Sequence, residues 1–244
     1  MNLRKSWVVA LKDFEIFTKK KQILISLLIF PLIMGIGFPF IIRGIIEEPT
    51  LKVDELIAII NTFSLIYIML PSFIPPSLAS YSIVGEKTEK TLEPLLATPI
   101  TDDELLFGKI IASFLPSISI SYLSAILFML LIDIFTFDKF HYFFFPNWTM
   151  AVILLLIVPF VILLSVEVNV LISSKISDLR TASQLGALSM TPFLILYFTF
   201  QTYLNGLNLF NLFVLILFLL LIVIALFILM KSVFNREKIL TKWT

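Results

Sequence analysis

One polar insert holds most of the residues whose types and spacing suggest a function. It runs from Gly85 to Lys109, reads GEKTEKTLEPLLATPITDDELLFGK and carries nine charges, although an apolar stretch of membrane length flanks it on each side. In a helix, Glu86, Glu89 and Glu93 would lie at i, i+3 and i+7 on one face. The like-charge pair Glu89 and Glu93 costs such a helix roughly 0.2–0.5 kcal/mol. A helix selected only for its own stability would avoid that pair, whereas a basic partner outside the chain would use it.

The rest of the insert is predicted to form further helical pieces. Pro94 disfavours α geometry at the residue before it, so the first helix should end at Glu93. A second turn would follow over residues 95–97, and the stretch TDDE from Thr101 to Glu104 fits a capping box that begins a longer helix. These pieces would present acids to the cytosol together with apolar side chains that have no evident core of their own, namely Leu92, Leu95 and Leu96. The simpler interpretation is a solvated loop whose charges only follow topology rules.

Catalytic and metal-binding chemistry finds little support in the sequence. The chain has no cysteine, and its one histidine, His141, lies in an aromatic segment typical of a membrane interface, with no second histidine to complete a metal site. Neither H-E-x-x-H nor G-x-S-x-G occurs, and Gly108-Lys109 lacks the other residues of a phosphate-binding loop. We therefore predict no catalytic residue, no metal ligand and no cofactor-binding residue in this chain.

The composition is that of an integral membrane protein. Of 244 residues, 59% are hydrophobic and 14% are charged, against roughly 25% charged in an average soluble domain, and the mean hydropathy is +1.04. A bilayer core of about 30 Å needs about 20 apolar helical residues. We predict an all-α polytopic protein, one transmembrane domain over residues 1–244, with six spans: Gln22–Ile42, Leu56–Val84, Lys109–Ile132, Thr149–Ser173, Thr181–Tyr203 and Leu207–Met230.

The distribution of lysine and arginine orients these spans. Fifteen of them fall on one side of the predicted membrane, and only Arg43, Lys52 and Lys139 fall on the other. Because cytoplasmic loops carry the excess of basic residues, we predict a multi-pass protein of the cell membrane with both termini in the cytoplasm. The insert at 85–108, a second loop at 174–181 and the tail at 231–244 would then also be cytoplasmic.

The first 21 residues are predicted to form an amphipathic helix in the cytoplasmic membrane interface. Five apolar side chains share one helical face, with lysines off it: Trp7, Val8, Leu11, Phe14 and Phe17. A cleaved signal peptide does not fit, because the apolar run that follows is of full span length and lacks a small-x-small cleavage site. The alternative is a charged tail with scattered hydrophobic residues.

Two places inside the predicted membrane region are candidates for a translocation pathway. Pro75 and Pro76, followed by Ser77, should bend the second span, and the bend would either line the pathway or be a static kink. Glu167 and Asn169 lie near the inner end of the fourth span. A buried charge there costs at least ~2.5–3.5 kcal/mol, so Glu167 should face a pathway, snorkel, or pair with a cation such as Lys175 or Arg180.

The insert resembles the cytoplasmic loop of the ABC type-2 exporter permeases. The resemblance is carried by EKTEKTLEPLLATPI from Glu86 to Ile100, by Glu104-Leu105 and by Gly108-Lys109, although glycine is commoner where residues 88–90 lead into Thr91. It extends to the interfacial N-terminal helix, the six spans and a second cytoplasmic segment, SDLRTASQ from Ser177 to Gln184.

The resemblance implies a permease dimer that binds two soluble ATPase subunits, which would hold the ATP and Mg. Residues 85–99 would be the coupling helix in an ATPase groove, with the glutamates as charge partners and the leucines as apolar anchors, and Asp178 and Arg180 would make a lesser contact. A channel or assembly scaffold that needs no ATPase is the main alternative, and a membrane enzyme is less favoured. The sequence leaves open the substrate, the direction of transport, and whether the dimer is formed by two copies or by two similar permeases.

Overall fold

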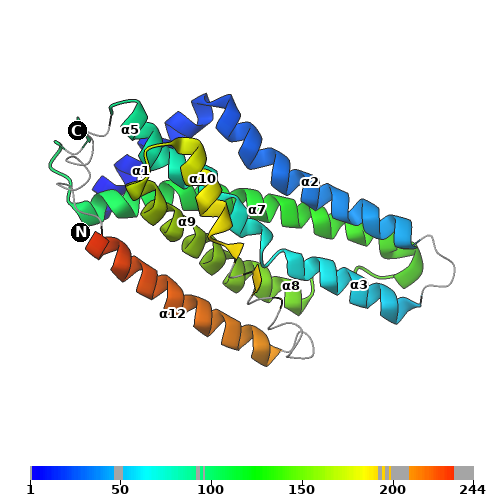
Figure 1. The fold of residues 1–244 in the computed structure, drawn as a ribbon. Coiled ribbons are helices and arrows are strands. Elements are labelled where there is room, and N and C mark those ends of the chain that lie inside the picture. Colours follow the sequence, from blue (N-terminus) through cyan, green and yellow to red (C-terminus); the bar gives the residue numbers. More distant parts are fainter. Residues whose placement is uncertain are drawn as a thin grey trace.

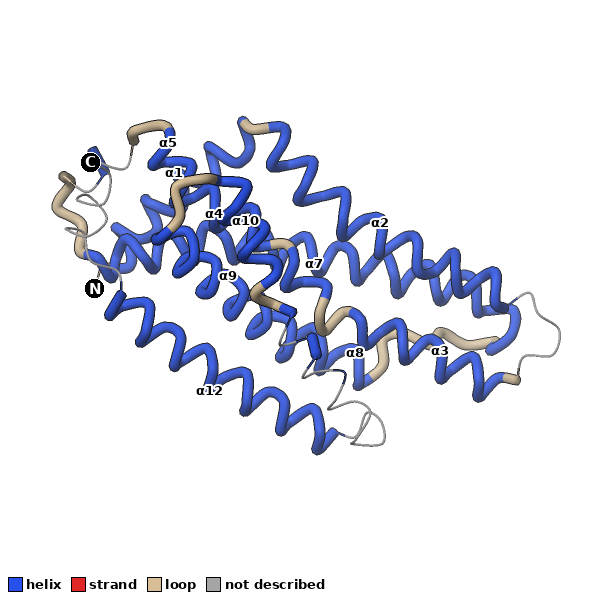
Figure 2. The backbone as a smooth tube through the Cα atoms, in the orientation of Figure 1, coloured by secondary structure: helices blue, strands red, loops and turns tan. Residues whose placement is uncertain are grey.

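The computed structural model describes residues 2–46, 52–91, 94–95, 97–191, 194–195, 198 and 209–233. Within these ranges every regular element is helical, and nearly the whole backbone lies in helices (Figure 2). The elements are, in order, α1 (Leu3–Lys19), α2 (Lys21–Ile46), α3 (Val53–Ile66), η1 (Leu70–Phe73), α4 (Pro75–Ser80), η2 (Tyr81–Gly85), α5 (Glu86–Thr88), α7 (Asp102–Phe140), α8 (Trp148–Val152), η3 (Ile153–Ile157), α9 (Val158–Lys175), α10 (Leu179–Leu188) and α12 (Leu209–Val233).

Five of the described helical stretches are long and apolar enough to cross a membrane: Ile23–Ile46, Val53–Thr88, Asp102–Phe140, Trp148–Lys175 and Phe213–Lys231. They correspond to the first four and the last of the six predicted spans. The remaining span, predicted at 181–203, begins in α10 and then reaches residues that lie mostly outside the described part of the chain. Residues 234–244 of the predicted tail also lie outside it.

The second span is interrupted at its prolines, as predicted. The α-helix stops at Ile66, a 3₁₀ turn follows over residues 70–73, and a new α-helix begins with Pro75 in its first turn. Proline is tolerated there because the first N–H groups of a helix have no intrahelical partner. Pro75 and Pro76 are buried and Ser77 is half-buried, and their role in a pathway stays a prediction.

α7 begins where the capping box predicts. The Glu104 N–H donates to Thr101 Oγ1 at 3.3 Å, and the Thr101 N–H donates in return to a Glu104 carboxylate oxygen at 3.2 Å. From this start the helix runs for 39 residues and ends at His141, which takes a left-handed φ of 56°. α7 is therefore longer than the predicted span and is the longest element in the bundle (Figure 1).

Small residues let the helices approach closely, as is usual for helices packed in membranes. α2 lies along α7, and a Cβ added to Gly35 would meet the Ser124 carbonyl at 2.7 Å. Ser124 Oγ in turn donates to the Pro31 carbonyl at 2.6 Å. On the other side of the bundle, Ser165 Oγ of α9 donates to the Ser72 carbonyl at 2.6 Å. These contacts fix the helices between the two polar ends of the molecule.

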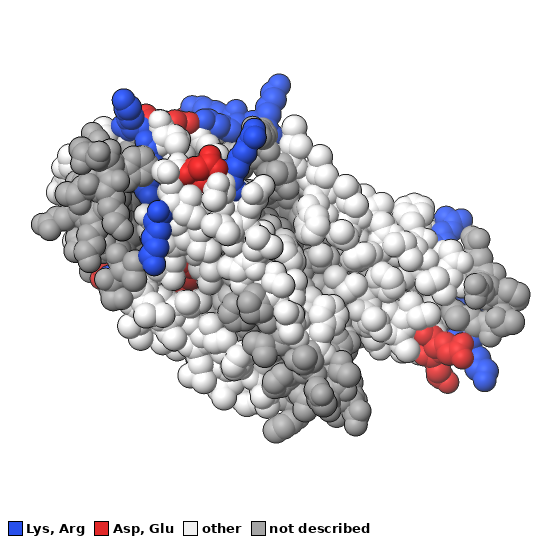
Figure 3. Space-filling view, viewed as in Figure 1, with Lys and Arg blue, Asp and Glu red and all other residues white. Residues whose placement is uncertain are grey.

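On the face shown in Figure 3, the charged side chains of the described residues gather at the two ends, with a broad surface free of charged side chains between them. α1, α5 and the start of α10 lie together at one end, close to the start of α7 (Figure 1). The described parts of the segments predicted to be cytoplasmic thus share one end of the molecule.

Candidate functional site

The insert begins with a single helical turn, α5 at Glu86–Thr88. A Schellman motif closes it: the Thr91 N–H donates to the Glu86 carbonyl at 2.9 Å while Lys90 takes a left-handed φ of 56°. The predicted helix from Glu86 to Glu93 is therefore wrong, because the chain leaves the helix before it reaches the proline. As a result no single helix runs from Glu86 to Glu93, and Glu93 itself lies outside the described residues.

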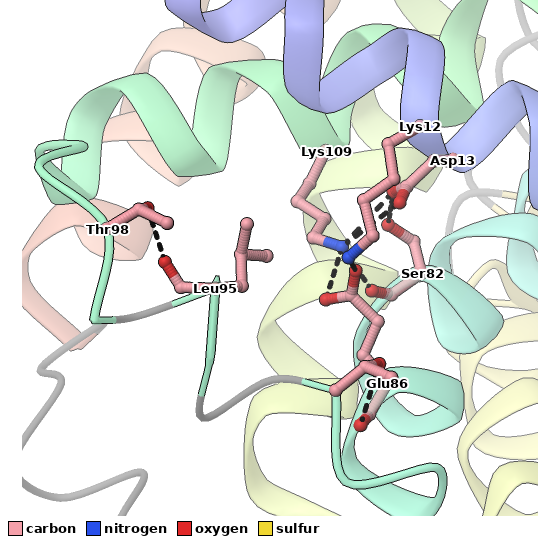
Figure 4. Close-up of polar contacts among 8 residues, drawn as sticks. Lys12, Asp13, Ser82, Glu86, Leu95, Thr98 and Lys109 are labelled. Carbon is pink, nitrogen blue, oxygen red and sulfur yellow. Dashed lines mark hydrogen bonds and ion pairs between the residues drawn. The ribbon is translucent and has the colours of Figure 1, made fainter.

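Glu86 instead belongs to a buried cluster of charges that joins three parts of the chain (Figure 4). We call Lys12, Asp13, Ser82, Glu86 and Lys109 the junction cluster. Lys109 Nζ lies 2.6 Å from Glu86 Oε2 and 3.2 Å from Asp13 Oδ2, and Lys12 Nζ donates to Glu86 Oε1 at 2.6 Å. Ser82 donates its hydroxyl to Asp13, and its carbonyl accepts from Lys109 at 2.6 Å. Two carboxylates thus face two ammonium groups.

The cluster is buried at its centre. Glu86 and Lys109 are each 2% exposed and Asp13 is 1% exposed, whereas the Lys12 side chain keeps 38% of its surface exposed. The expectation that Glu86 presents its charge to the solvent is therefore wrong. Burying charged groups is favourable only where close partners compensate the lost hydration, and the balanced charges of the cluster provide that compensation.

Asp13 titrates abnormally in this setting. Burial raises the pKa of its carboxyl above the ordinary value, the nearby Glu86 carboxylate raises it further, and the Lys109 ammonium opposes the rise. The charged form of Asp13 therefore depends on Lys109, which is the cation closest to it.

Glu89, the second acid of the insert, is also paired within the chain. It accepts hydrogen bonds from Lys20 Nζ and, at 2.6 Å, from the Tyr81 hydroxyl. The bond from Lys20 is the main cause that holds the pKa of Glu89 below its ordinary value. Its side chain remains 41% exposed. For Glu86 and Glu89, basic partners are therefore present in the chain itself, namely Lys12 in the middle of α1 and Lys20 at its C-terminal cap.

α1 packs on α7 through small side chains. Its buried residues are Ser6, Val9, Ala10, Asp13 and Phe17. A Cβ added to Gly108 of α7 would lie 2.7 Å from the Ser6 carbonyl and 2.8 Å from Val9 Cβ, so no larger residue fits there without a shift. The Gly108-Lys109 pair of the motif thus has a structural reason: the glycine admits α1, and the lysine pairs with its aspartate.

The apolar face predicted for α1 is divided in the structure. Phe17 is buried in the protein, whereas Trp7, Val8 and Leu11 are 45%, 60% and 48% exposed. The reason is that α7 covers the side of the helix that carries Ser6, Val9 and Asp13 and leaves the neighbouring apolar side free. A helix does form over Leu3–Lys19, and its place in a membrane interface stays a prediction.

The later part of the insert lies against α1 and the start of α7. Leu95 packs near Val9, Leu105 and Ile100, so the expectation that it lacks a core is wrong. Leu92, Glu93 and Leu96 lie outside the described residues. Two bonds fasten the segment: Lys5 Nζ donates to the Pro99 carbonyl at 2.8 Å, and the Asn2 N–H donates to Glu104 Oε1 at 2.7 Å. An outer strip of described residues is exposed, at positions 88–91, 94 and 97–99.

The second polar segment lies beside the insert. Lys87 Nζ donates to the carbonyls of Ser173 and Ser174, at 2.9 and 3.1 Å, where α9 ends. A cation is favoured there because the C-terminal carbonyls of a helix carry partial negative charge. Asp178, predicted as a contact residue, caps α10 by accepting from the Thr181 N–H at 2.8 Å, and this hydrogen bonding lowers the pKa of Asp178. Asp178 and Arg180 are both exposed.

The two polar residues of the fourth span are buried, in different surroundings. Asn169 Nδ2 donates to the Ser165 carbonyl at 2.7 Å, and its other end packs so tightly on Gly186 of α10 that a Cβ there would lie 1.5 Å from Oδ1. Glu167 is 2% exposed and makes no hydrogen bond with the described residues. The predicted alternative of a pair with Lys175 or Arg180 is wrong, because both of those residues are exposed while Glu167 is buried and its Oε2 has no hydrogen-bond partner among the described residues.

Asp13 and the structural role of Lys109 were missed by sequence reasoning. The signal was present: Asp13 stands on a helical face otherwise made of Ser6, Val9, Ala10 and Phe17, which is an unusual place for an acid unless a cation meets it. Lys109 follows a glycine at the start of a span, and a glycine at such a place suggests close approach of another backbone.

These features define a multi-pass helical membrane protein whose polar insert is cross-linked to its first helix at one end of the bundle. The chain belongs to the ABC-2 transporter family, because the model of the family described as ABC-2 family transporter protein matches residues 7–215. The match covers most of α1, the insert and the second polar segment, and it confirms the resemblance drawn from the insert. Family membership makes the chain a permease subunit of an ABC transporter. No curated protein matches the sequence significantly.

Proposed function

We propose that this chain is the membrane-spanning subunit of an ATP-driven exporter, that it works as a dimer, and that separate ATPase subunits dock on its polar insert. ATP and Mg would lie on those subunits. The observation that carries the proposal is the outer strip of the insert, which is exposed while its inner side is fastened to α1 and α7.

The fastening supports a docking role because a preorganised surface loses less entropy when a partner binds. Three connections hold the strip: the junction cluster at its start, the bond from Lys5 to Pro99 near its middle, and the capping box at Thr101. A loop that only followed topology rules would need none of them.

The second polar segment belongs to the same surface. Lys87 joins the end of the second span to the end of α9, and the exposed Asp178 and Arg180 follow directly after α9. An ATPase that docks on the outer strip would therefore also reach this segment. With fifteen of eighteen basic residues on the side of the insert, the positive-inside rule favours the cytoplasm for this surface and for both termini.

The test is purification of the complex from its own membranes through a tag on this chain. We expect a separate polypeptide with a phosphate-binding loop to co-purify and the complex to hydrolyse ATP, because this chain has no such loop. ATP hydrolysis by the chain alone would overturn the proposal. A purified, folded chain without any ATPase would favour the channel or scaffold alternative.

A further inference from the structure

The junction cluster connects three elements that the chain itself joins only through long segments. Lys12 and Asp13 belong to α1, Ser82 and Glu86 to the end of the second span, and Lys109 to the start of α7 (Figure 4). Along the chain, Glu86 and Lys109 are separated by residues 87–108, which make up most of the insert. In space their charged atoms are 2.6 Å apart.

Lys109 is the centre of this connection. Its Nζ lies within 3.2 Å of Asp13 on α1 and within 2.6 Å of both the Ser82 carbonyl and Glu86 on the second span. All three of its partners are at least nine-tenths buried. Such charges attract each other strongly because little water screens them, and separating them would leave buried charges without compensation.

Close packing at the same place also prevents α1 from sliding along α7. Gly108 lies against the Ser6 carbonyl and Val9 closely enough that α1 and α7 meet almost backbone to backbone. Apolar side chains alone could rearrange as two helices slide, but an ion pair beside a backbone contact has one favourable arrangement.

We propose that Asp13 and Lys109 are positioning residues that make α1, the end of the second span and the start of α7 move as one body, so that displacement of the docked insert moves α7. The proposal rests on the proposed function, because it needs an ATPase docked on the outer strip. The ion pair carries the movement of the insert to α7 directly, in parallel with the chain between residues 86 and 109.

The experiment uses the purified complex and a reporter on α7. Because the chain has no cysteine, an Ile134→Cys substitution gives one labelling site in each copy of it, and the chain is labelled before the ATPase subunits are added. Ile134 is 65% exposed and lies far along α7 from the cluster. The label is an environment-sensitive fluorophore, and the measurement is its change when Mg-ATP is added. In the otherwise unchanged chain we expect a clear ATP-dependent change.

Lys109→Gln should reduce that change about tenfold, a size typical of a lost coupling between sites, when it is measured on the fraction of complex that retains a bound ATPase and is expressed per ATP hydrolysed. The matched control is Lys231→Gln, which removes a lysine from a surface pair with Asp103 at the same end of α7, with both side chains more than two-fifths exposed. The control should keep the full change. If Lys109 only stabilised the fold, Lys109→Gln would lower the yield of the complex. The complex that remained would then show the normal fluorescence change for its rate of ATP hydrolysis.

Two further variants keep the proposal testable if Lys109→Gln does not fold. Asp13→Asn combined with Lys109→Gln leaves a neutral, hydrogen-bonding pair, and it should also lose the signal. Lys109→Arg keeps a positive charge facing Asp13, Glu86 and the Ser82 carbonyl, and it should keep most of the signal.

An undiminished signal in the neutral double variant overturns the positioning role, even though the ATPase docks as proposed. A complex that binds and hydrolyses ATP with no signal in the unchanged chain overturns it as well. A chain that binds no ATPase at all refutes the proposed function itself.

Discussion

Glu86 and Glu167 are two glutamates with the same exposure and opposite surroundings. Each is 2% exposed. Glu86 lies between two lysines in the junction cluster, whereas Glu167, on α9, has no hydrogen-bond or ion-pair partner among the described residues. Burial therefore does not tell the two apart, and the partners do. Glu86 has the features of a charge that stabilises the fold. Glu167 is a buried carboxyl group for which the described helices supply no partner.

The largest loss of stability is expected when Lys109, the buried cation of the junction cluster, is replaced. Lys109→Met leaves two buried carboxylates with only Lys12 beside them, and breaking a buried pair in this way costs about 3–5 kcal/mol. Thermal unfolding in detergent would measure the loss. The matched surface variant, Lys231→Met, should cost only about 0–1 kcal/mol because its pair with Asp103 is half exposed.

The stability that Lys109→Met loses should depend on pH, and the loss should be smaller at acidic pH. The folded-state pKa of Asp13 is raised, so its contribution favours the folded state below its ordinary pKa and is lost as the pH rises through the raised value. Without Lys109 that rise should grow, and acidification should recover part of the lost stability. A loss that does not change with pH would show that the carboxyls are not the cause.

A moderate difference in stability is expected between the two variants in which Glu86 or Glu167 is replaced by glutamine. Glu86→Gln removes the negative charge that two lysines share and leaves a single acceptor oxygen for them, so it should destabilise the protein by about 1–3 kcal/mol. Glu167→Gln replaces a buried carboxyl group that lacks a described partner with a neutral amide of the same shape, so the folded protein should be at least as stable, while transport or its pH dependence changes. Equal destabilisation by both substitutions would contradict this difference and would assign Glu167 a structural partner.

The smallest effect is expected in the turn that follows Glu86. Lys90 takes a left-handed φ of 56°, a conformation that costs a non-glycine residue about 1–2 kcal/mol. Lys90→Gly should therefore stabilise the turn by up to about 1 kcal/mol, since glycine also loses more freedom on folding. Hydrogen exchange of residues 86–91 would measure the gain, and faster exchange in this segment would contradict the left-handed turn. The glycine that resembling permeases favour near this point is consistent with that geometry.

Some features followed from local sequence because their physics is local. The apolar stretches predicted the membrane-spanning helices, and the TDDE stretch predicted the cap of α7, since both depend on residues close in the chain. The break in the second span followed from Pro75 for the same reason. The polar insert also carried enough pattern to indicate the family that the comparison confirmed.

The partners of the charged residues in the insert could be identified only from the folded structure. Glu86 looks like a surface acid in sequence, because nothing near it in the chain shows that Lys109 and Lys12 will lie within 2.6 Å of it. Leu95 likewise gains its apolar contacts from α1 and α7. Charge pairing and close packing depend on which helices meet, and that is set by long-range contacts such as Gly108 against Val9. Helix formation and membrane insertion are properties of each segment, whereas the partner of a buried charge is a property of the assembled bundle.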